Sequence, residues 1–207
     1  CTPTNPGHFA PTGSTEQAAC SPGTVAPNAS MGACDKCAAG TYQTANGTSA
    51  CLRCETGEFS TAIGAESRTC KRCAAGTYGD ERAASSCKAC AAGHFTTTIG
   101  RNVCDECAAG HFQSEEGKDG CIICTNGKHQ PLTGKTKCEP QSRRGFYVSF
   151  GITLPCVAGR YTDAPGQLAC KQCAPGRFQN VSNATSCDPC LSDAYQPKGG
   201  QAYCTKH

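Results

Sequence analysis

The chain has 207 residues and a formal net charge of +3, from 19 Lys and Arg against 16 Asp and Glu. This small and interleaved charge excludes electrostatic recognition of nucleic acid or of an anionic lipid surface. Leu, Ile, Val and Phe together supply only 22 residues, below the roughly 20% share of a packed domain, so we do not expect a sizeable hydrophobic core.

Twenty-one residues are cysteine, which indicates what replaces that core. Disulfides in such number persist only in an oxidising compartment, so the chain is predicted to be extracellular or exposed at a cell surface. The longest apolar stretch, residues 146–154, is far shorter than the roughly 20 residues that span a bilayer. We therefore expect no membrane contact by these residues.

The cysteines belong to a repeat of about 17 residues, seen most cleanly in Cys37, Gly40, Tyr42, Gly47 and Cys51. We call Cys37 the opening cysteine and Cys51 the closing cysteine, and count positions from the opening cysteine, so that the glycines lie at positions 3 and 10 and the aromatic at position 5. The next repeat opens three residues after the last one closes, through a C-x-x-C step. Because the glycines punctuate each repeat, we expect short β-hairpins and turns with little or no helix.

The predicted fold class is therefore small and disulfide-rich, an elongated tandem array of these repeats. In such a solenoid-like string each repeat touches only its neighbours, and local crosslinks take the place of a common core. Each loop of 14 residues between paired cysteines is expected to contribute about 3 kcal/mol when closed by a disulfide.

Residues 1–19 form a cysteine-less repeat preceded by a closing cysteine, Cys1. Thr4, Gly7, Phe9 and Gln17 keep the repeat frame. Cys1 lies where the closing cysteine of a preceding repeat belongs, so we expect it to be unpaired within the chain. The chain is accordingly predicted to be a segment of a longer array.

Residues 20–138 contain seven repeats that have both cysteines. The third of them is two residues longer than the others, with the insertion between Gly64 and Cys70. The predicted pairs are Cys20 with Cys34, Cys37 with Cys51, Cys54 with Cys70, Cys73 with Cys87, Cys90 with Cys104, Cys107 with Cys121, and Cys124 with Cys138.

Residues 139–155 form a second cysteine-less repeat, in which Gln141, Phe146, Gly151 and Thr153 keep the frame. Its apolar run has two interpretations. Hydrophobic packing could compensate for the missing disulfide, or the run could form a lateral interface, because a thin array offers little cover for apolar surface. The candidate interface residues are Arg143, Arg144, Phe146, Tyr147 and Phe150.

Residues 156–207 contain three further repeats and the start of another C-x-x-C step. Their predicted pairs are Cys156 with Cys170, Cys173 with Cys187, and Cys190 with Cys204.

The two cysteine-less repeats favour this pairing of each opening cysteine with its own closing cysteine. Each of these repeats lacks both the opening and the closing cysteine. This is expected if the two are bonded, since losing only one would leave a reactive thiol. Bonds inside the C-x-x-C steps would instead strand Cys138 and Cys156. The spacing alone leaves the pairing undecided.

The aromatic side chains at position 5 are expected to cover the joints between repeats. The alternative is an exposed aromatic ladder that binds sugar or another chain. The aromatic positions are Phe9, Tyr42, Phe59, Tyr78, Phe95, Phe112, Phe146, Tyr161, Phe178 and Tyr195.

Four N-x-S/T sequons, at Asn28, Asn46, Asn180 and Asn183, predict covalent N-linked glycans. Thr96, Thr97 and Thr98 form a cluster that O-linked glycans could occupy, although such a run is also simply an extended polar stretch.

Catalytic and metal-binding interpretations are weaker than a structural one. Zinc ribbons use paired C-x-x-C knuckles, but beside each cysteine-less repeat one cysteine of such a pair is missing and the other would stand alone. A thioredoxin-like enzyme needs one C-x-x-C on a βαβ framework, and no helical pattern is present. We expect no enzyme activity, no metal and no cofactor, and we interpret His8, His94 and His111 at position 4 as solvated.

The repeat resembles the ephrin-receptor-like cysteine-rich repeat, through the pattern C-x-x-C-x-x-G-x-[YF] at Cys70, Cys73, Gly76 and Tyr78. The resemblance covers essentially the whole chain and extends to tumour necrosis factor receptor-type modules. It implies stalks, adhesion regions or extracellular fibres of secreted and surface proteins.

Two functional hypotheses follow. The first is a structural protein, a glycosylated rod or a subunit of an extracellular filament or surface appendage that associates with itself or with neighbouring array segments. The second is a ligand-binding or adhesive ectodomain stalk of a cell-surface receptor, with a protein ligand.

Overall fold

The computed structural model describes residues 3–206, so Cys1, the predicted unpaired cysteine, lies outside the described residues. Internal contacts divide the chain into two compact units. The first contains the described residues up to Cys90 together with Phe95–Asp105 and Gly117–Asp119. The second contains Ala91–His94, Glu106–Glu116 and the described residues from Gly120 onward.

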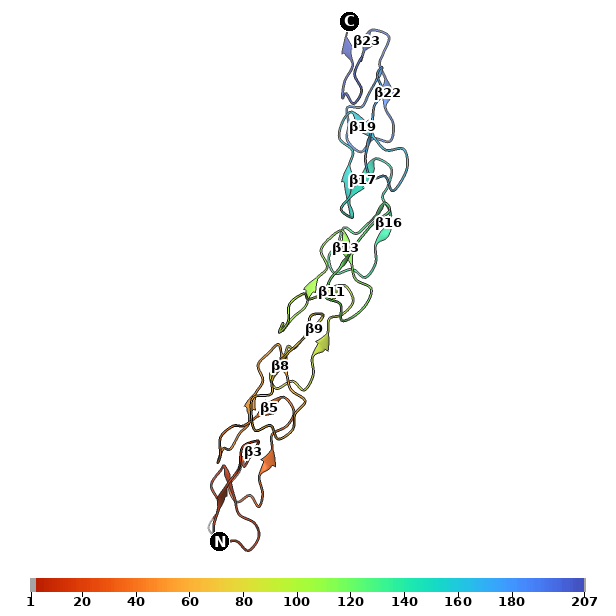
Figure 1. Ribbon diagram of the computed structural model, residues 1–207. Helices are drawn as coiled ribbons and strands as arrows, with labels where there is room; N and C mark the ends of the chain where they lie inside the picture. The colour runs from red at the N-terminus through yellow and green to blue at the C-terminus, as the bar shows by residue number, and fades with distance from the viewer. Residues whose placement is uncertain (1–2, 207) are drawn as a thin grey trace. The chain divides into compact units, whose positions relative to one another are not determined.

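Residues 3–206 contain no helix, and their strands pair two by two (Figure 1). Nearly all the strands are only two residues long, as the glycine spacing predicts. The pairs are β1 (His8–Phe9) with β2 (Ala18–Ala19), β3 (Thr24–Val25) with β4 (Asp35–Lys36), β5 (Thr41–Tyr42) with β6 (Leu52–Arg53), β7 (Glu58–Phe59) with β8 (Lys71–Arg72), β9 (Thr77–Tyr78) with β10 (Lys88–Ala89), β11 (His94–Phe95) with β12 (Asp105–Glu106), β13 (His111–Phe112) with β14 (Ile122–Ile123), β15 (Lys128–His129) with β16 (Glu139–Gln141), β17 (Phe146–Ser149) with β18 (Ile152–Pro155), β19 (Arg160–Tyr161) with β20 (Lys171–Gln172), β21 (Arg177–Phe178) with β22 (Asp188–Pro189), and β23 (Ala194–Tyr195) with β24 (Thr205–Lys206).

In the disulfide-closed repeats the hairpins join positions 4 and 5 to the two residues after the closing cysteine, and β15 with β16 departs from this by one extra residue. In the repeat that opens at Cys37, Gly40 has φ 81° and the Thr41 N–H donates to the Ala38 carbonyl at 3.0 Å. This turn sends Tyr42 into register with Leu52, directly after the closing cysteine. The C-x-x-C spacing is thus the second strand of the hairpin together with the two cysteines that flank it.

Successive repeats are joined by backbone hydrogen bonds that recur at fixed positions. The Cys54 N–H donates to the Gly40 carbonyl at 2.9 Å, and the Gly40 N–H donates to the Ser60 carbonyl at 2.7 Å. In the other direction, the Gly64 N–H donates to the Cys37 carbonyl at 2.7 Å. Because these bonds use main-chain groups, the joint does not depend on which side chains a repeat carries.

The glycines at position 3 also reach the next-but-one repeat, so the expectation that a repeat touches only its neighbours is wrong. A Cβ on Gly57 would overlap the carbonyl oxygen of Gly100, and a Cβ on Gly76 would overlap that of Gly117. Both pairs lie within the first unit. A hydrogen atom at position 3 is therefore required by close backbone approach, in addition to the turn.

Opening cysteines are among the most buried residues of nearly every disulfide-closed repeat. Nine of the ten are at most 4% exposed, whereas the closing cysteines are mostly half-buried. Thr4 and Ser142, at the opening position of the cysteine-less repeats, are also buried, at 4% and 1% exposure. Their hydroxyl oxygens have no hydrogen-bond partner, which is unusual for buried polar atoms and indicates a position shaped for sulfur.

Candidate functional site

Ten disulfides join each opening cysteine to the closing cysteine of its own repeat, the pairing that the sequence analysis favours. Nine have a sequence separation of 14 residues, and Cys54–Cys70 has 16. The Cα–Cα distances are 5.6–5.8 Å, within the usual range for disulfides. The insertion in the long repeat is therefore absorbed in the loop and leaves the crosslink unchanged.

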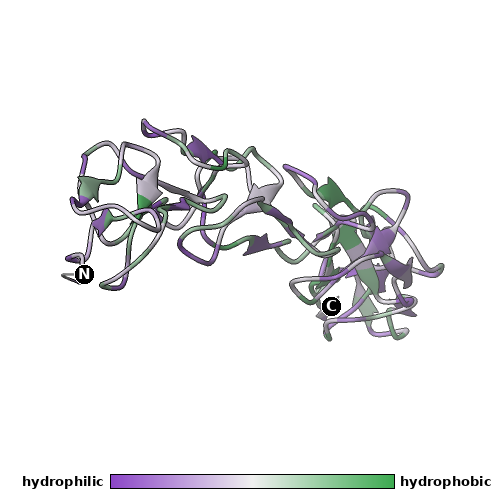
Figure 2. Cartoon of the chain, turned by 90° about the horizontal axis from the view of Figure 1, so that it is seen from below, coloured by the Kyte–Doolittle hydropathy of each residue, from purple (hydrophilic) through white to green (hydrophobic). Residues whose placement is uncertain are grey.

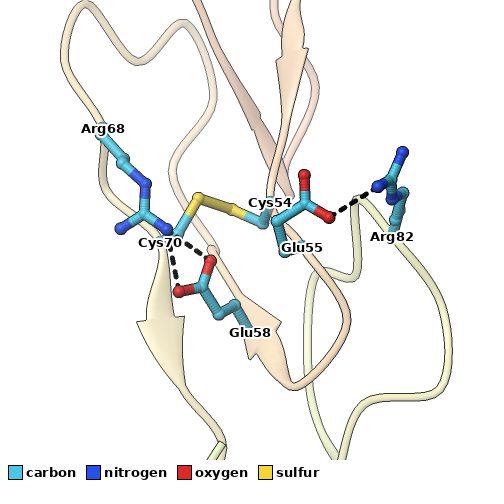
Figure 3. A network of polar contacts seen from close by, with 6 residues as sticks. All are labelled: Cys54, Glu55, Glu58, Arg68, Cys70 and Arg82. Atoms are coloured by element: carbon cyan, nitrogen blue, oxygen red, sulfur yellow. Dashed lines mark hydrogen bonds and ion pairs between the residues drawn. A yellow bond between two sulfur atoms is a disulfide. The ribbon is translucent and has the colours of Figure 1, made fainter. Parts of the chain in front are cut away.

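The inserted segment of the long repeat is tied down by ion pairs around Cys54–Cys70 (Figure 3). Arg68 contacts Glu58 at 2.6 Å, and Arg82 of the next repeat contacts Glu55 at 2.9 Å. The hydrogen bonds that Arg68 donates to the Glu58 carboxylate raise the pKa of Arg68. All but Glu58 are well exposed, so each pair contributes little to stability.

Two further exposed pairs link positions 7 and 15 of one repeat. Lys88 lies 2.9 Å from Asp80, and Lys171 lies 2.7 Å from Asp163. The hydrogen bond that the lysine donates lowers the pKa of each aspartate and raises the pKa of each lysine. These pairs brace hairpins and form no site.

Position 6 holds a set of buried glutamines that the sequence analysis missed. Gln130, 2% exposed, donates from Nε2 to the Lys137 carbonyl at 2.9 Å and accepts from the Leu132 N–H at 3.1 Å. Both partners lie in its own loop, so the amide braces the return to the closing cysteine. The recurrence of Gln at position 6 could have been read from the sequence. The same two bonds recur at Gln43, Gln113, Gln179 and Gln196.

We expect Gln130→Ala to destabilise its repeat by about 2 kcal/mol, because two backbone groups lose the partner that the buried Gln130 amide gives them. Gln196→Ala is the matched control, since Gln196 makes the same bonds at 2.7 and 3.2 Å in a more exposed position. Hydrogen exchange at the Leu132 and Lys198 amides measures both variants. Equal effects in the two would contradict a role for burial.

The predicted glycan acceptors separate into accessible and inaccessible ones. All four sequon residues are exposed, which suits the predicted N-linked glycosylation: Asn28, Asn46, Asn180 and Asn183. Thr96 is 0% exposed and its hydroxyl donates to the Thr98 carbonyl at 3.3 Å. Thr96 is thus wrong as an O-glycan acceptor, because position 6 lies inside the joint; Thr97 and Thr98 are exposed.

The second cysteine-less repeat begins one residue later than predicted. The Ser142 N–H donates to the Gly127 carbonyl at 3.2 Å, the bond that opening cysteines make elsewhere, and the Gly166 N–H donates to the Ser142 carbonyl at 3.0 Å. Gln141, predicted at this position, is instead the exposed last residue of β16. The cause is a shift of register between Lys128 and His129, which gives β16 one extra residue.

The corrected frame places Tyr147 at position 5, in place of Phe146. Tyr147 pairs with Leu154 as Tyr42 pairs with Leu52. Ser142 and Thr153 therefore take the places of an opening and a closing cysteine. In the first cysteine-less repeat Gln17 takes the closing place, and its Oε1 accepts from the Asn5 N–H at 3.0 Å.

The predicted interface residues lie in or directly before the hairpin of β17 and β18, the longest among the described residues, whose Phe, Val, Ile and Leu residues belong to the hydrophobic, green-coloured part of the chain in Figure 2. Arg143 and Arg144 are exposed in the turn before β17, and Phe146 and Tyr147 are half-buried on it. Phe150 is 82% exposed at the hairpin tip. Within β17 only Val148 is buried, so the apolar run compensates for the missing disulfide in part and leaves the rest accessible.

Neighbouring apolar side chains extend this surface beyond the predicted residues. Ile152 Cγ1 lies 3.4 Å from the point where Gly110 would carry a Cβ, and Ile123 pairs with His111 beside Gly110. We call the exposed side chains of this surface the hairpin patch: Ile122, Ile123, Phe150, Ile152 and Leu154.

Among residues 3–206, no three His, Cys, Asp or Glu side chains gather in a way that could hold a metal ion. His94 Nε2 lies 4.0 Å from Glu106 Oε1, on the partner strand of the same hairpin. In the part of the chain that the structure describes, no helix is long and apolar enough to cross a membrane.

These features define a class of extracellular proteins built from tandem, disulfide-closed small repeats. Residues 23–69 and 61–103 each match the family model described as tyrosine-protein kinase ephrin type A/B receptor-like. The two matched segments together cover residues 23–103 and are similar to this family, which confirms over those residues the resemblance seen in the sequence. A search of curated proteins found no match to the chain. Repeats of this kind are receptor ectodomain modules and not catalytic ones, which together with the disulfides indicates an extracellular or cell-surface location.

Proposed function

We propose that the chain is part of an extracellular ectodomain whose hairpin patch binds the apolar pocket of a protein partner. The match to receptor-type repeats favours this second hypothesis over the filament hypothesis. Arg143 and Arg144, exposed at the base of the same hairpin, add positive charge beside the patch.

The observation that carries this proposal is the conformation of Phe150. Its ring is 82% exposed and its backbone has φ 49°, in the left-handed region. A bulky residue there is strained by about 1–2 kcal/mol, and the two-residue turn that it forms with Gly151 favours Asn or Gly. Neither packing nor turn geometry explains an aromatic at this tip, and strain of this kind accumulates at functional sites.

The filament hypothesis stays a prediction with one feature in its favour. The backbone joints repeat uniformly within each unit, as a load-carrying structure requires. The hairpin patch interrupts that uniformity at one place, which suits a ligand-binding ectodomain better than contacts distributed along a polymer.

Phe150→Asn tests the proposal, because it removes the ring and relieves the strain in one change. The variant is expected to keep or gain up to about 1 kcal/mol of stability and to lose at least tenfold in saturable binding to the surface of intact source cells. Ile63→Asn is the matched control, since Ile63 is 70% exposed in the first unit.

Unchanged binding by Phe150→Asn would contradict the proposal. Regular polymers of the purified chain under the electron microscope, without saturable cell binding, would return the filament hypothesis to first place.

A further inference from the structure

Arg143 and Arg144 form an exposed basic pair in the turn before β17. The Phe146 N–H donates to the Arg143 carbonyl at 3.3 Å, which closes the turn. Paired basic residues are the recognition element of one class of secretory-pathway endopeptidases, which cleave the peptide bond after the second basic residue.

The pair lies outside every disulfide-closed loop, in the longest stretch between two such loops. The flanking bonds are Cys124–Cys138 and Cys156–Cys170, so none of the ten disulfides spans residues 139–155. A cut inside a closed repeat leaves both pieces joined through sulfur. A cut between Arg144 and Gly145 leaves them with no covalent link among the described residues.

The bond is protected in the closed structure. The Gly145 N–H donates to both the carbonyl and the hydroxyl oxygen of Thr162, at 3.0 and 2.7 Å, and Ser142 is buried. Cleavage therefore requires local opening of the repeat, and its rate follows the population of the open form. The missing disulfide raises that population by on the order of 100-fold relative to a closed repeat.

We propose that the Arg144–Gly145 peptide bond is a processing site for a serine endopeptidase specific for paired basic residues. Hydrolysis breaks the C–N bond: the water oxygen becomes part of the Arg144 carboxylate, and the Gly145 nitrogen becomes a free amine. The two halves of the chain are thereby separated, each with its own disulfide-closed repeats.

The chain carries a second basic pair that serves as an internal control. Lys71 and Arg72 are also exposed, but they form β8 between Cys70 and Cys73, each held in a disulfide. Arg72 also pairs with Glu58 in β7. Local opening is restrained on both sides, so this pair is expected to resist the same enzyme.

The test incubates the native, full-length chain with a recombinant calcium-dependent endopeptidase of this specificity, without reduction. Cleavage is expected after Arg144, giving two pieces that separate on a non-reducing denaturing gel and an N-terminus at Gly145 by mass spectrometry. Arg144→Gln should abolish it, and Arg72→Gln should leave it unchanged.

A second pair of variants tests the role of the missing disulfide. Ser142→Cys with Thr153→Cys places cysteines at the opening and closing positions and keeps both arginines, so cleavage seen on a reducing gel should slow by about 100-fold. Ser142→Ala with Thr153→Ala should be cut at about the rate of the parent chain, because the buried Ser142 hydroxyl has no hydrogen bond to lose.

Three results would overturn the proposal. The native chain could resist the enzyme under conditions in which the reduced, unfolded chain is cut after Arg144. Cleavage after Arg72 could match the rate after Arg144. The added cysteine pair could also form its disulfide and leave the cleavage rate unchanged.

Discussion

Gly57→Ala is expected to disrupt the array over three consecutive repeats. The new methyl group would meet the Gly100 carbonyl, a backbone atom that cannot rotate away, and the φ of +79° disfavours any L side chain. The strain of the left-handed backbone costs about 1–2 kcal/mol, and overpacking adds about 1–3 kcal/mol. A total loss of about 2–5 kcal/mol is comparable to the roughly 3 kcal/mol that one repeat gains from its disulfide.

Hydrogen exchange followed by mass spectrometry measures this loss, because an array does not unfold in a single two-state step. Protection should fall at the amides of Gly57, Ala83 and Gly100, which bond to the Gly79, Cys54 and Cys73 carbonyls.

Gly176→Ala is the matched control. Gly176 also lies at position 3 and has φ +78°, but no atom lies within 4 Å of the place that the new methyl group would take. It should cost only the backbone strain, about 1–2 kcal/mol. Equal effects in Gly57→Ala and Gly176→Ala would show that the approach of next-but-one repeats contributes nothing.

Replacing Cys73 and Cys87 together by Ala is expected to destabilise their repeat by about 3 kcal/mol, the value for a loop of this length. Cys73 is fully buried, so the lost sulfur also leaves a small void at the opening position of the repeat. The Gly100 bond to the Cys73 carbonyl uses the main chain and should persist. The variant should therefore loosen one repeat and spare the next.

Complete reduction extends the same test to all ten bonds. Dithiothreitol should abolish the protection of the joint amides throughout residues 3–206, whereas a chelator should change nothing, since no described cluster could hold a metal. Unchanged exchange after full reduction would show that the backbone network suffices without sulfur. Peptides that link Cys37 to Cys54 in a non-reduced digest would contradict the pairing itself.

The sequence was sufficient for the covalent framework because paired losses of cysteine carry information on pairing. It was also sufficient for the hairpins, since glycine at positions 3 and 10 limits the strands between them. It was insufficient for the second cysteine-less repeat, where no cysteine marks the opening position. There the frame depends on one extra residue in β16, and the sequence pattern does not distinguish Gln141 from Ser142 as the opening residue.

Contacts beyond the neighbouring repeat could not be predicted for a different reason. Glycine at position 3 satisfies a turn, and that local explanation conceals the approach of Gly57 to Gly100. The glutamines at position 6 look like ordinary surface residues in a polar sequence. Only the folded structure shows that Gln130 lies inside its loop with both amide atoms bonded.

The joints made of main-chain groups have an evolutionary corollary. Because the hydrogen bonds between repeats use main-chain groups, a gene segment that encodes one repeat can be duplicated or deleted at little cost in stability at the new joint. Unequal recombination can then change the number of repeats in the array, and the exposed residues of each copy can diverge. A chain with one additional repeat inserted between Cys87 and Cys90 is accordingly expected to fold.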